Sequence, residues 1–493
     1  MKMRTTFWIV LACQLLIMPV WTLAVEPGIK TVAASLEAPR KRETCKVCGM
    51  YIDEYIKSAA ELTYKDGSKA FTCGVACMLR EVEDAGGISA FQSVKVHDWV
   101  SGNLVDAETA TYVVGSKVIP DMVPNYIAFA NRSEAEAFAV KEGGDVIGFN
   151  IAYEDISPVG TTAPFRLRTA VTPGAGNFSV GMVYGYTTKD SVKNGSGSSD
   201  PTQFIYGNRA QPQAPHDSHV HMQALTVNYS PTDNLALFMN IPWFERRAST
   251  LTQSAANQPR AFNETLAEEN GIGDIAIEGR YNFWRSTRWD KFASLLLGVS
   301  LPTGEFNGDR TRSAPLSTAT FNRYLVSRSA GMQLGKDTAT FTGGLLYSER
   351  WKDFWLHLSA LHTVNPENGY QFKYGDVTTG GLALHYTPNY DLMLGVEIDS
   401  SYTQKNEDLG YQVGNSGGVV TNLAFVGDYR FLNAFGGNFK LRGSVGLPIY
   451  EDLNSLRVVT NRNTGAFLTQ VQPGDGFFGN LAIQWTFRDA PNY

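Results

Sequence analysis

The residues best suited to chemistry in this sequence carry sulfur and lie near the N-terminus. Cys45 and Cys48 are separated by two residues, and Gly49 and Met50 follow directly. Two thiols and a thioether in one short segment are soft donors, and such donors favour monovalent copper. The same residues could instead form disulfides in an oxidising compartment or carry out thiol redox chemistry. Metal binding is the interpretation we favour, with Cys45, Cys48 and Met50 as candidate ligands.

A second cysteine pair follows at Cys73 and Cys77. A zinc ion held by Cys45 and Cys48 would need two more thiolate or imidazole ligands, and this pair could supply them. Spaced four residues apart, the pair would share one face of a helix that began before Cys73. A second thiol site and a disulfide both remain open for this pair. The redox alternative is weaker, because the βαβ pattern of thioredoxin-type CxxC proteins is missing here.

Three of the seven histidines stand close together, at His216, His219 and His221. If residues 217–229 form a strand, His219 and His221 share one face, which we expect to line the lumen of a barrel. Two imidazoles at this spacing can bind copper or zinc, so both are lower-ranked candidate ligands. The alternative interpretation is a polar lumen wall.

The N-terminus has the pattern of a secretory signal. Lys2 and Arg4 precede a mostly apolar stretch over residues 7–23, and Ala24 offers a small residue for cleavage. The sequence therefore predicts a signal peptide over residues 1–24, which removes Cys13, and a linker over residues 25–43. A permanent anchor is the rival interpretation, but the apolar stretch is short for a membrane span. No later segment is apolar enough for a membrane helix.

Residues 44–157 predict a small α+β periplasmic domain. Strands are expected at 58–64 and 70–72 around an Asp66-Gly67 turn, and at 94–100, 111–114 and 126–130. Helices are expected at 74–82 and 133–140. Ser133 is the candidate N-cap of the second helix, with Glu136 completing a capping box.

Residues 165–493 predict an antiparallel transmembrane β-barrel of about 12 strands. Apolar and polar residues alternate over long segments, aromatic residues gather near the segment ends, and short connections tend to alternate with long ones. The low charged content of 18%, the aromatic content of 12% and the 47 glycines suit a large sheet. A soluble β-sandwich is the alternative. The alternation of short and long connections breaks down between residues 324 and 375, where a candidate strand at 327–335 is doubtful. An even strand number places both barrel ends, and with them the small domain, in the periplasm.

Residues 44 to about 150 resemble the NosL family of periplasmic copper(I)-binding proteins linked to maturation of nitrous oxide reductase. The family's CGM motif stands at residues 48–50, and Asp66-Gly67, Trp99-Val100, the segment 110–116 and Met122 ahead of Ala128-Phe129 follow in order. The resemblance implies Cys48 and Met122 as copper(I) ligands, with Met50 nearby; Cys45 is a candidate from its position alone. Cys73 and Cys77 lie outside the family pattern. The barrel half resembles outer-membrane transporters associated with phenol degradation.

These features favour a copper(I)-handling protein of the outer membrane, with the barrel as anchor or pore. Its expected partners are the copper ion, outer-membrane lipid and a periplasmic cuproprotein or its maturation factors. The alternatives are a transporter of small organic or hydrophobic solutes with a disulfide-bonded adaptor domain, and a tethered thiol-redox protein. We expect no enzyme, because no nucleophile–base pair, phosphate loop or paired carboxylates stand out. The net charge of −6 and the lack of a basic patch argue against nucleic-acid binding.

Overall fold

The computed structural model describes residues 42–156, 163–207, 213–253, 262–307, 330–461 and 466–488. The predicted signal peptide and nearly all of the predicted linker lie outside these ranges, and the domain boundaries stay predictions. Within these ranges, no helix has the length and apolar character that a membrane crossing would require.

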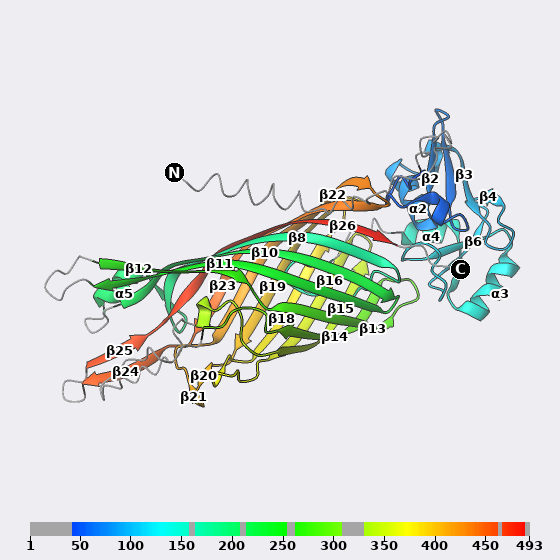
Figure 1. The fold of residues 1–493 in the computed structure, drawn as a ribbon. Coiled ribbons are helices and arrows are strands. Elements are labelled where there is room, and N and C mark those ends of the chain that lie inside the picture. Colours follow the sequence, from blue (N-terminus) through cyan, green and yellow to red (C-terminus); the bar gives the residue numbers. More distant parts are fainter. Residues whose placement is uncertain are drawn as a thin grey trace, which may run out of the picture. The chain divides into compact units, whose positions relative to one another are not determined.

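The N-terminal domain contains two small antiparallel sheets and three helices (Figure 1). The first sheet has the order β2-β1-β3-β4, formed by Lys69–Thr72, Ala60–Tyr64, Phe91–His97 and Leu104–Asp106. The second has the order β6-β5-β7, formed by Tyr126–Phe129, Thr111–Val114 and Asp145–Gly148. The helices are α2 (Val75–Asp84), α3 (Arg132–Glu142) and α4 (Phe149–Asp155), and short 3-10 turns span Ile52–Glu54 and Ile88–Ala90. The α+β class expected from the sequence is confirmed.

Local turn chemistry explains most of these elements, with one exception. Asp66 accepts hydrogen bonds from the backbone and hydroxyl of Ser68, and so forms the expected tight turn between β1 and β2. The prediction for the start of α3 was wrong, because Asn131 rather than Ser133 is the N-cap. Asn131 has the extended backbone that an N-cap needs, which leaves Ser133 inside the first turn. Glu136 pairs with Arg132 instead of completing a capping box.

Twelve long antiparallel strands form a closed barrel (Figure 1). Strand β8 pairs with both β26 and β10, so the sheet has no free edge, as closure requires. In ring order the strands are β8 (Asn177–Asn194), β10 (Gln213–Thr232), β11 (Leu235–Gln253), β13 (Ile275–Arg285), β14 (Lys291–Leu301), β15 (Thr340–Trp351), β16 (Phe354–Val364), β18 (Val377–Tyr386), β19 (Leu392–Thr403), β22 (Gly418–Ala434), β23 (Gly437–Leu453) and β26 (Gln472–Arg488). The predicted barrel and its strand number are confirmed.

Connections alternate around the whole barrel. Short turns at 233–234, 286–290, 352–353, 387–391 and 435–436 lie at the end where β8 begins and β26 ends. The other end carries longer connections with short elements of their own: β9 (Gly197–Ser199), α5 (Pro201–Gly207), β12 (Phe262–Ile272), η3 (Ala330–Met332), β17 (Phe372–Lys373), β20 (Glu407–Asp408), β21 (Tyr411–Gln412), β24 (Leu456–Asn461) and β25 (Ala466–Gln470). The described part of the doubtful strand at 327–335 contains a 3-10 turn and no strand. Short and long connections therefore keep alternating there.

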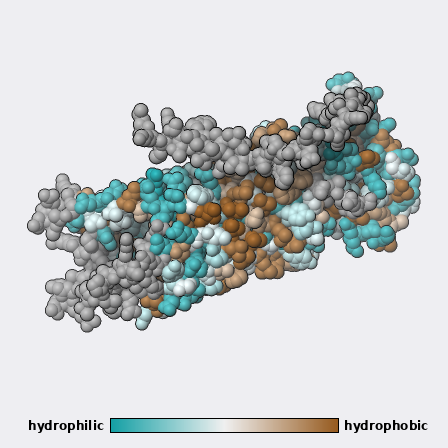
Figure 2. All heavy atoms as spheres, viewed as in Figure 1, coloured by the Kyte–Doolittle hydropathy of each residue, from teal (hydrophilic) through white to brown (hydrophobic). Residues whose placement is uncertain are grey.

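The two faces of the barrel wall differ in polarity. On β19, for example, Leu394, Val396 and Ile398 are exposed on the outside, whereas the alternate residues Glu397 and Asp399 are buried. Figure 2 shows hydrophobic side chains gathered over the middle of the wall on the face drawn. An apolar outer belt around a polar interior is the arrangement of transmembrane barrels.

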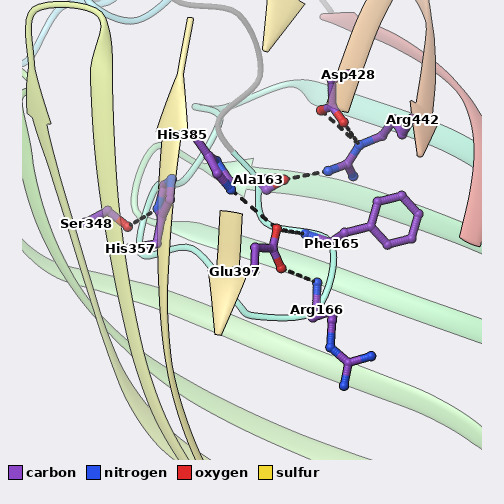
Figure 3. A network of polar contacts seen from close by, with 9 residues as sticks. All are labelled: Ala163, Phe165, Arg166, Ser348, His357, His385, Glu397, Asp428 and Arg442. Carbon is purple, nitrogen blue, oxygen red and sulfur yellow. Dashed lines mark hydrogen bonds and ion pairs between the residues drawn. The ribbon is translucent and has the colours of Figure 1, made fainter. Parts of the chain in front are cut away.

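A segment between the small domain and β8, residues 163–172, lies against the inward-facing side chains of the barrel (Figure 3). The backbone N–H groups of Phe165 and Arg166 donate to the Glu397 carboxylate at 2.7 and 2.8 Å. Arg166 also forms an ion pair with Asp399, and Arg168 binds Glu278 through two nitrogens at 2.8 and 2.7 Å. The interior of the barrel is therefore occupied by the protein's own chain.

Hydrogen bonds extend this interior network along the wall. His385 contacts Glu397 at 3.3 Å, and the His357 ring contacts the Ser348 hydroxyl at 2.8 Å (Figure 3). Ser348 also accepts from the backbone N–H of Ala170 at 2.9 Å. Hydrogen-bond partners are what buried polar groups require, so the network holds residues 163–172 in one place.

Candidate metal centre

The short loop over residues 45–50 is shaped by its own backbone. The N–H of Cys45 donates to the carbonyl of Met50 at 2.7 Å, and the N–H of Gly49 donates to the carbonyl of Cys45 at 2.9 Å. Gly49 has a φ of 79°, and a Cβ there would lie 2.7 Å from the carbonyl oxygen of Gly437. Glycine is therefore required both by the turn and by the close approach of a second backbone.

Contacts with β2 bring this loop to the second cysteine pair. The backbone N–H of Lys46 donates to the carbonyl of Phe71 at 3.1 Å, which places the loop beside the end of β2. Cys73 follows β2 directly, and Cys77 lies in the first turn of α2. Helix α2 begins after Cys73, so the condition for a shared helix face is not met, yet the Cys73 and Cys77 sulfurs are 3.8 Å apart.

The four cysteine sulfurs form one cluster. All four Sγ atoms lie within 4.8 Å of one another, and each cysteine is at most 2% exposed. The Sγ atoms of Cys48 and Cys73 are 3.4 Å apart, well beyond a disulfide bond of about 2.0 Å, and all four cysteines are free thiols in this structure. This cluster is the one group of three or more metal-ligating side chains found among the described residues.

Two methionines border the thiols. The Met122 Sδ lies 3.3 Å from the Cys77 Sγ, and Met50 is buried in the same cluster. Met50 and Met122 also line, together with Cys48, a cavity of about 80 Å³. The structure thus gathers the predicted residues Cys45, Cys48, Met50 and Met122 and adds the lower-ranked pair to them.

The thiols differ in how readily they ionise. Burial acts to raise the pKa of Cys45, but hydrogen bonds from the thiols of Cys48, Cys73 and Cys77 outweigh it and hold that pKa well below its ordinary value. Burial, with the neighbouring thiols, raises the pKa of Cys73. Hydrogen bonds with Cys45 and Cys48 raise the pKa of Cys77.

A buried cation lies next to the sulfurs. Arg80 is 2% exposed, its Nη1 lies 3.8 Å from the Met122 Sδ, and its guanidinium carbon stands 4.6 Å from the centre of the Tyr390 ring. Arg430 stacks on Tyr390 as well, at 3.3 Å, and donates to the carbonyl of Val47 at 2.9 Å. Sequence reasoning missed these residues. The spacing of Arg80 three positions after Cys77 could have indicated it, whereas Tyr390 lies in a distant turn without any local signal.

The histidine pair lies elsewhere and faces outward. On β10, His219 and His221 share a face with Leu225 and Tyr229, which are exposed on the outer surface. The prediction that they line the lumen was wrong, because alternate residues of one strand share a face and the apolar ones determine which side is outside. The His221 ring contacts the Tyr184 hydroxyl at 2.7 Å, and the two imidazole centres are 6.3 Å apart.

Comparisons with known proteins agree with this division of the chain. Residues 37–157 match the NosL family model. Over 115 residues the chain is 32% identical to the copper-binding lipoprotein NosL of Stutzerimonas stutzeri. These residues make up 22% of this chain and 60% of the relative. The chain therefore spans less than two thirds of that relative's length.

Two solved structures are similar to separate parts of the chain. An outer membrane channel from Pseudomonas putida F1 has a TM-score of 0.43 at 13% identity, covering 66% of this chain and 99% of its own. The copper chaperone NosL from Shewanella denitrificans has a TM-score of 0.21 at 24% identity, covering 25% of this chain and 96% of its own. The described residues of this chain themselves form two folds, a small α+β domain and a closed antiparallel barrel.

Proposed function

We propose that this chain is a copper(I)-binding protein of the outer membrane whose NosL domain holds the ion through sulfur. The ligands are Cys45, Cys48, Met50 and Met122, and Cys73 and Cys77 join them. One observation carries the proposal: four buried thiols lie within 4.8 Å of one another, with a thioether 3.3 Å from the nearest. The match to a copper-binding relative supports the same metal.

The donor set favours copper(I) over zinc. Four thiolates alone would suit a closed tetrahedral zinc site, and the sulfur separations fit either metal. Thioethers select copper(I), however, and the cluster includes Met122 and has Met50 beside it. A divalent copper ion would be served better by imidazole and oxygen ligands.

In this proposal the barrel anchors the domain in the outer membrane. The exposed apolar side chains of the wall meet lipid, and residues 163–172 occupy the lumen where an open pore would pass. Short turns face the periplasm in bacterial barrels, and the small domain contacts this end, for example through Asn125 and Trp289 at 3.0 Å. We therefore assign the domain to the periplasm.

Copper would leave the site by exchange of ligands with a periplasmic cuproprotein or one of its maturation factors. Thiolates and thioethers exchange a cuprous ion readily when a partner offers similar donors. The cavity beside Cys48, Met50 and Met122 gives an incoming sulfur room to approach.

The test is a copper(I) titration of the full chain in detergent, reduced and free of oxygen, against a chromophoric copper(I) chelator. We expect the chain to withdraw copper from the chelator, and the Cys48→Ser and Met122→Ala variants to do so less well. A chain that leaves the chelator fully loaded would refute the proposal. Cysteines found paired in the purified protein would instead support a solute transporter with a disulfide-bonded adaptor domain, and reversible thiol oxidation without copper binding would support a redox role.

A further inference from the structure

We propose that the sulfur cluster holds two copper(I) ions bridged by thiolates, rather than one. This inference rests on the proposed function and deepens it. The cluster offers four thiols and two thioethers from one buried region, namely Cys45, Cys48, Cys73, Cys77, Met50 and Met122. A single cuprous ion is satisfied by about three sulfur donors. Half of the six sulfur donors would then bind no metal ion.

The separations between sulfurs support a shared arrangement. Cys73 has Cys48 at 3.4 Å on one side and Cys77 at 3.8 Å on the other. Cys77 in turn has the Met122 thioether at 3.3 Å. Two sulfurs bound to one metal at about 2.3 Å each stand roughly 3.3–4.5 Å apart, depending on the angle between the bonds. Each neighbouring pair therefore has the spacing of two ligands on a common ion.

In this arrangement Cys73 is the thiolate that binds both copper ions. All four Sγ atoms lie within 4.8 Å of one another, and Cys73 contacts both Cys48 and Cys77. In the proposed arrangement the donors divide into two groups that share Cys73, one with Cys45 and Cys48 and one with Cys77 and Met122. A thiolate has enough lone pairs to bind two soft ions at once. One ion in each group, with Cys73 common to both, gives each ion about three sulfur ligands.

Charge balance also favours the second ion. Four bound thiolates bring four negative charges into a site whose cysteines are at most 2% exposed. Arg80 is the buried cation beside them, and its Nε has no hydrogen-bond partner among the described side chains and backbone. Uncompensated charge is costly where water is excluded. A second cuprous ion removes one more negative charge than a single ion does.

A cavity borders one side of the cluster. The cavity beside Cys48, Met50 and Met122 measures about 80 Å³.

The experiment counts copper in the full chain, purified in detergent and loaded under reducing, oxygen-free conditions with excess copper(I). Native mass spectrometry gives the number of ions per chain, and copper X-ray absorption detects copper–copper scattering. We expect two ions with a copper–copper contact in the natural chain. Replacing the bridge by Cys73→Ser should leave one ion and remove that contact, and Cys77→Ala should give the same result without changing the loop after β2.

Met78→Leu is the matched control. Met78 lies on α2 beside Cys77 but packs in the separate hydrophobic core of the domain, at 0% exposure. It should retain both ions. A single ion in the natural chain, without copper–copper scattering, overturns the two-ion cluster and leaves the copper(I) proposal standing. No copper at all, or one zinc ion that copper(I) does not displace, overturns both.

Discussion

The polar side chains inside the barrel and the sulfur cluster of the small domain are both buried, but they differ in the partners that they contact. In the barrel interior, Glu397 accepts hydrogen bonds from two backbone N–H groups and contacts His385, and Arg168 is matched by Glu278. In the small domain, the cysteine thiols contact one another and the thioether of Met122. A thiol is a weak donor and a weak acceptor, so these contacts leave its capacity as a ligand unused. Burial alone does not mark a metal site; a group of soft sulfur donors that contact mainly one another does.

The largest effect should come from Cys48→Ser. It replaces a soft ligand that contacts Cys73 at 3.4 Å with a hard hydroxyl. We expect copper(I) affinity to fall by at least about a hundredfold, more than the loss of an outer-shell partner usually costs. Chelator competition on the full chain measures this change. An unchanged affinity would mean that the cluster does not hold the ion.

A change in the barrel should alter stability and leave copper binding intact. Glu397→Ala removes the acceptor for Phe165 and Arg166 from a site with 0% exposure, so two backbone N–H groups lose their partner. We expect the free energy of unfolding in lipid vesicles to fall by about 3 kcal/mol. Glu397→Gln keeps an oxygen acceptor and should cost less. If either variant bound fewer copper ions, the polar network inside the barrel and the sulfur cluster would not be independent of each other.

Removing the buried cation should weaken copper binding moderately. Arg80→Met keeps much of the side-chain volume but takes away the positive charge 3.8 Å from Met122. We expect a loss of about tenfold in copper(I) affinity, as for other groups that support metal ligands. Arg80→Lys retains the charge and should lose less. Equal losses in the two variants would point to packing against Tyr390 rather than charge.

The lumen segment should limit ion flow through the barrel. Arg166→Ala combined with Arg168→Ala removes its ion pairs with Asp399 and Glu278. We expect single-channel conductance in planar bilayers to rise several-fold over a low starting value, because charged pairs no longer hold residues 163–172 in the lumen. A natural chain that already conducts as an open pore would contradict an anchoring role and favour transport.

The smallest effect should come from the outer histidines. His219→Ala with His221→Ala should leave the number of bound copper ions unchanged, because the pair lies on the outer surface with Tyr184 as a neighbour. Native mass spectrometry of the loaded double variant measures this. The loss of one ion would assign a copper site to this face.

Much of the fold could be predicted from the sequence because its signals are local. A period of two residues determines which side of a strand is apolar, and turn residues determine where strands end. The strand at Thr111–Val114, the hairpin at Asp66-Gly67 and the twelve-strand barrel were predicted on that basis. The start of α3 was missed because Asn131 and Ser133 both suit an N-cap, and only backbone geometry selects one of them.

The candidate site was only partly predictable. By itself the sequence determined that soft donors stand together at residues 45–50, since neighbours in the chain are neighbours in space. Only the tertiary structure brought Cys73, Cys77 and Met122 to that loop and placed Arg80 beside them. It also decided that His219 and His221 face outward. The position of residues 163–172 inside the barrel likewise depends on tertiary contacts. These contacts join residues far apart in sequence, and packing rather than any local periodicity decides which of them meet.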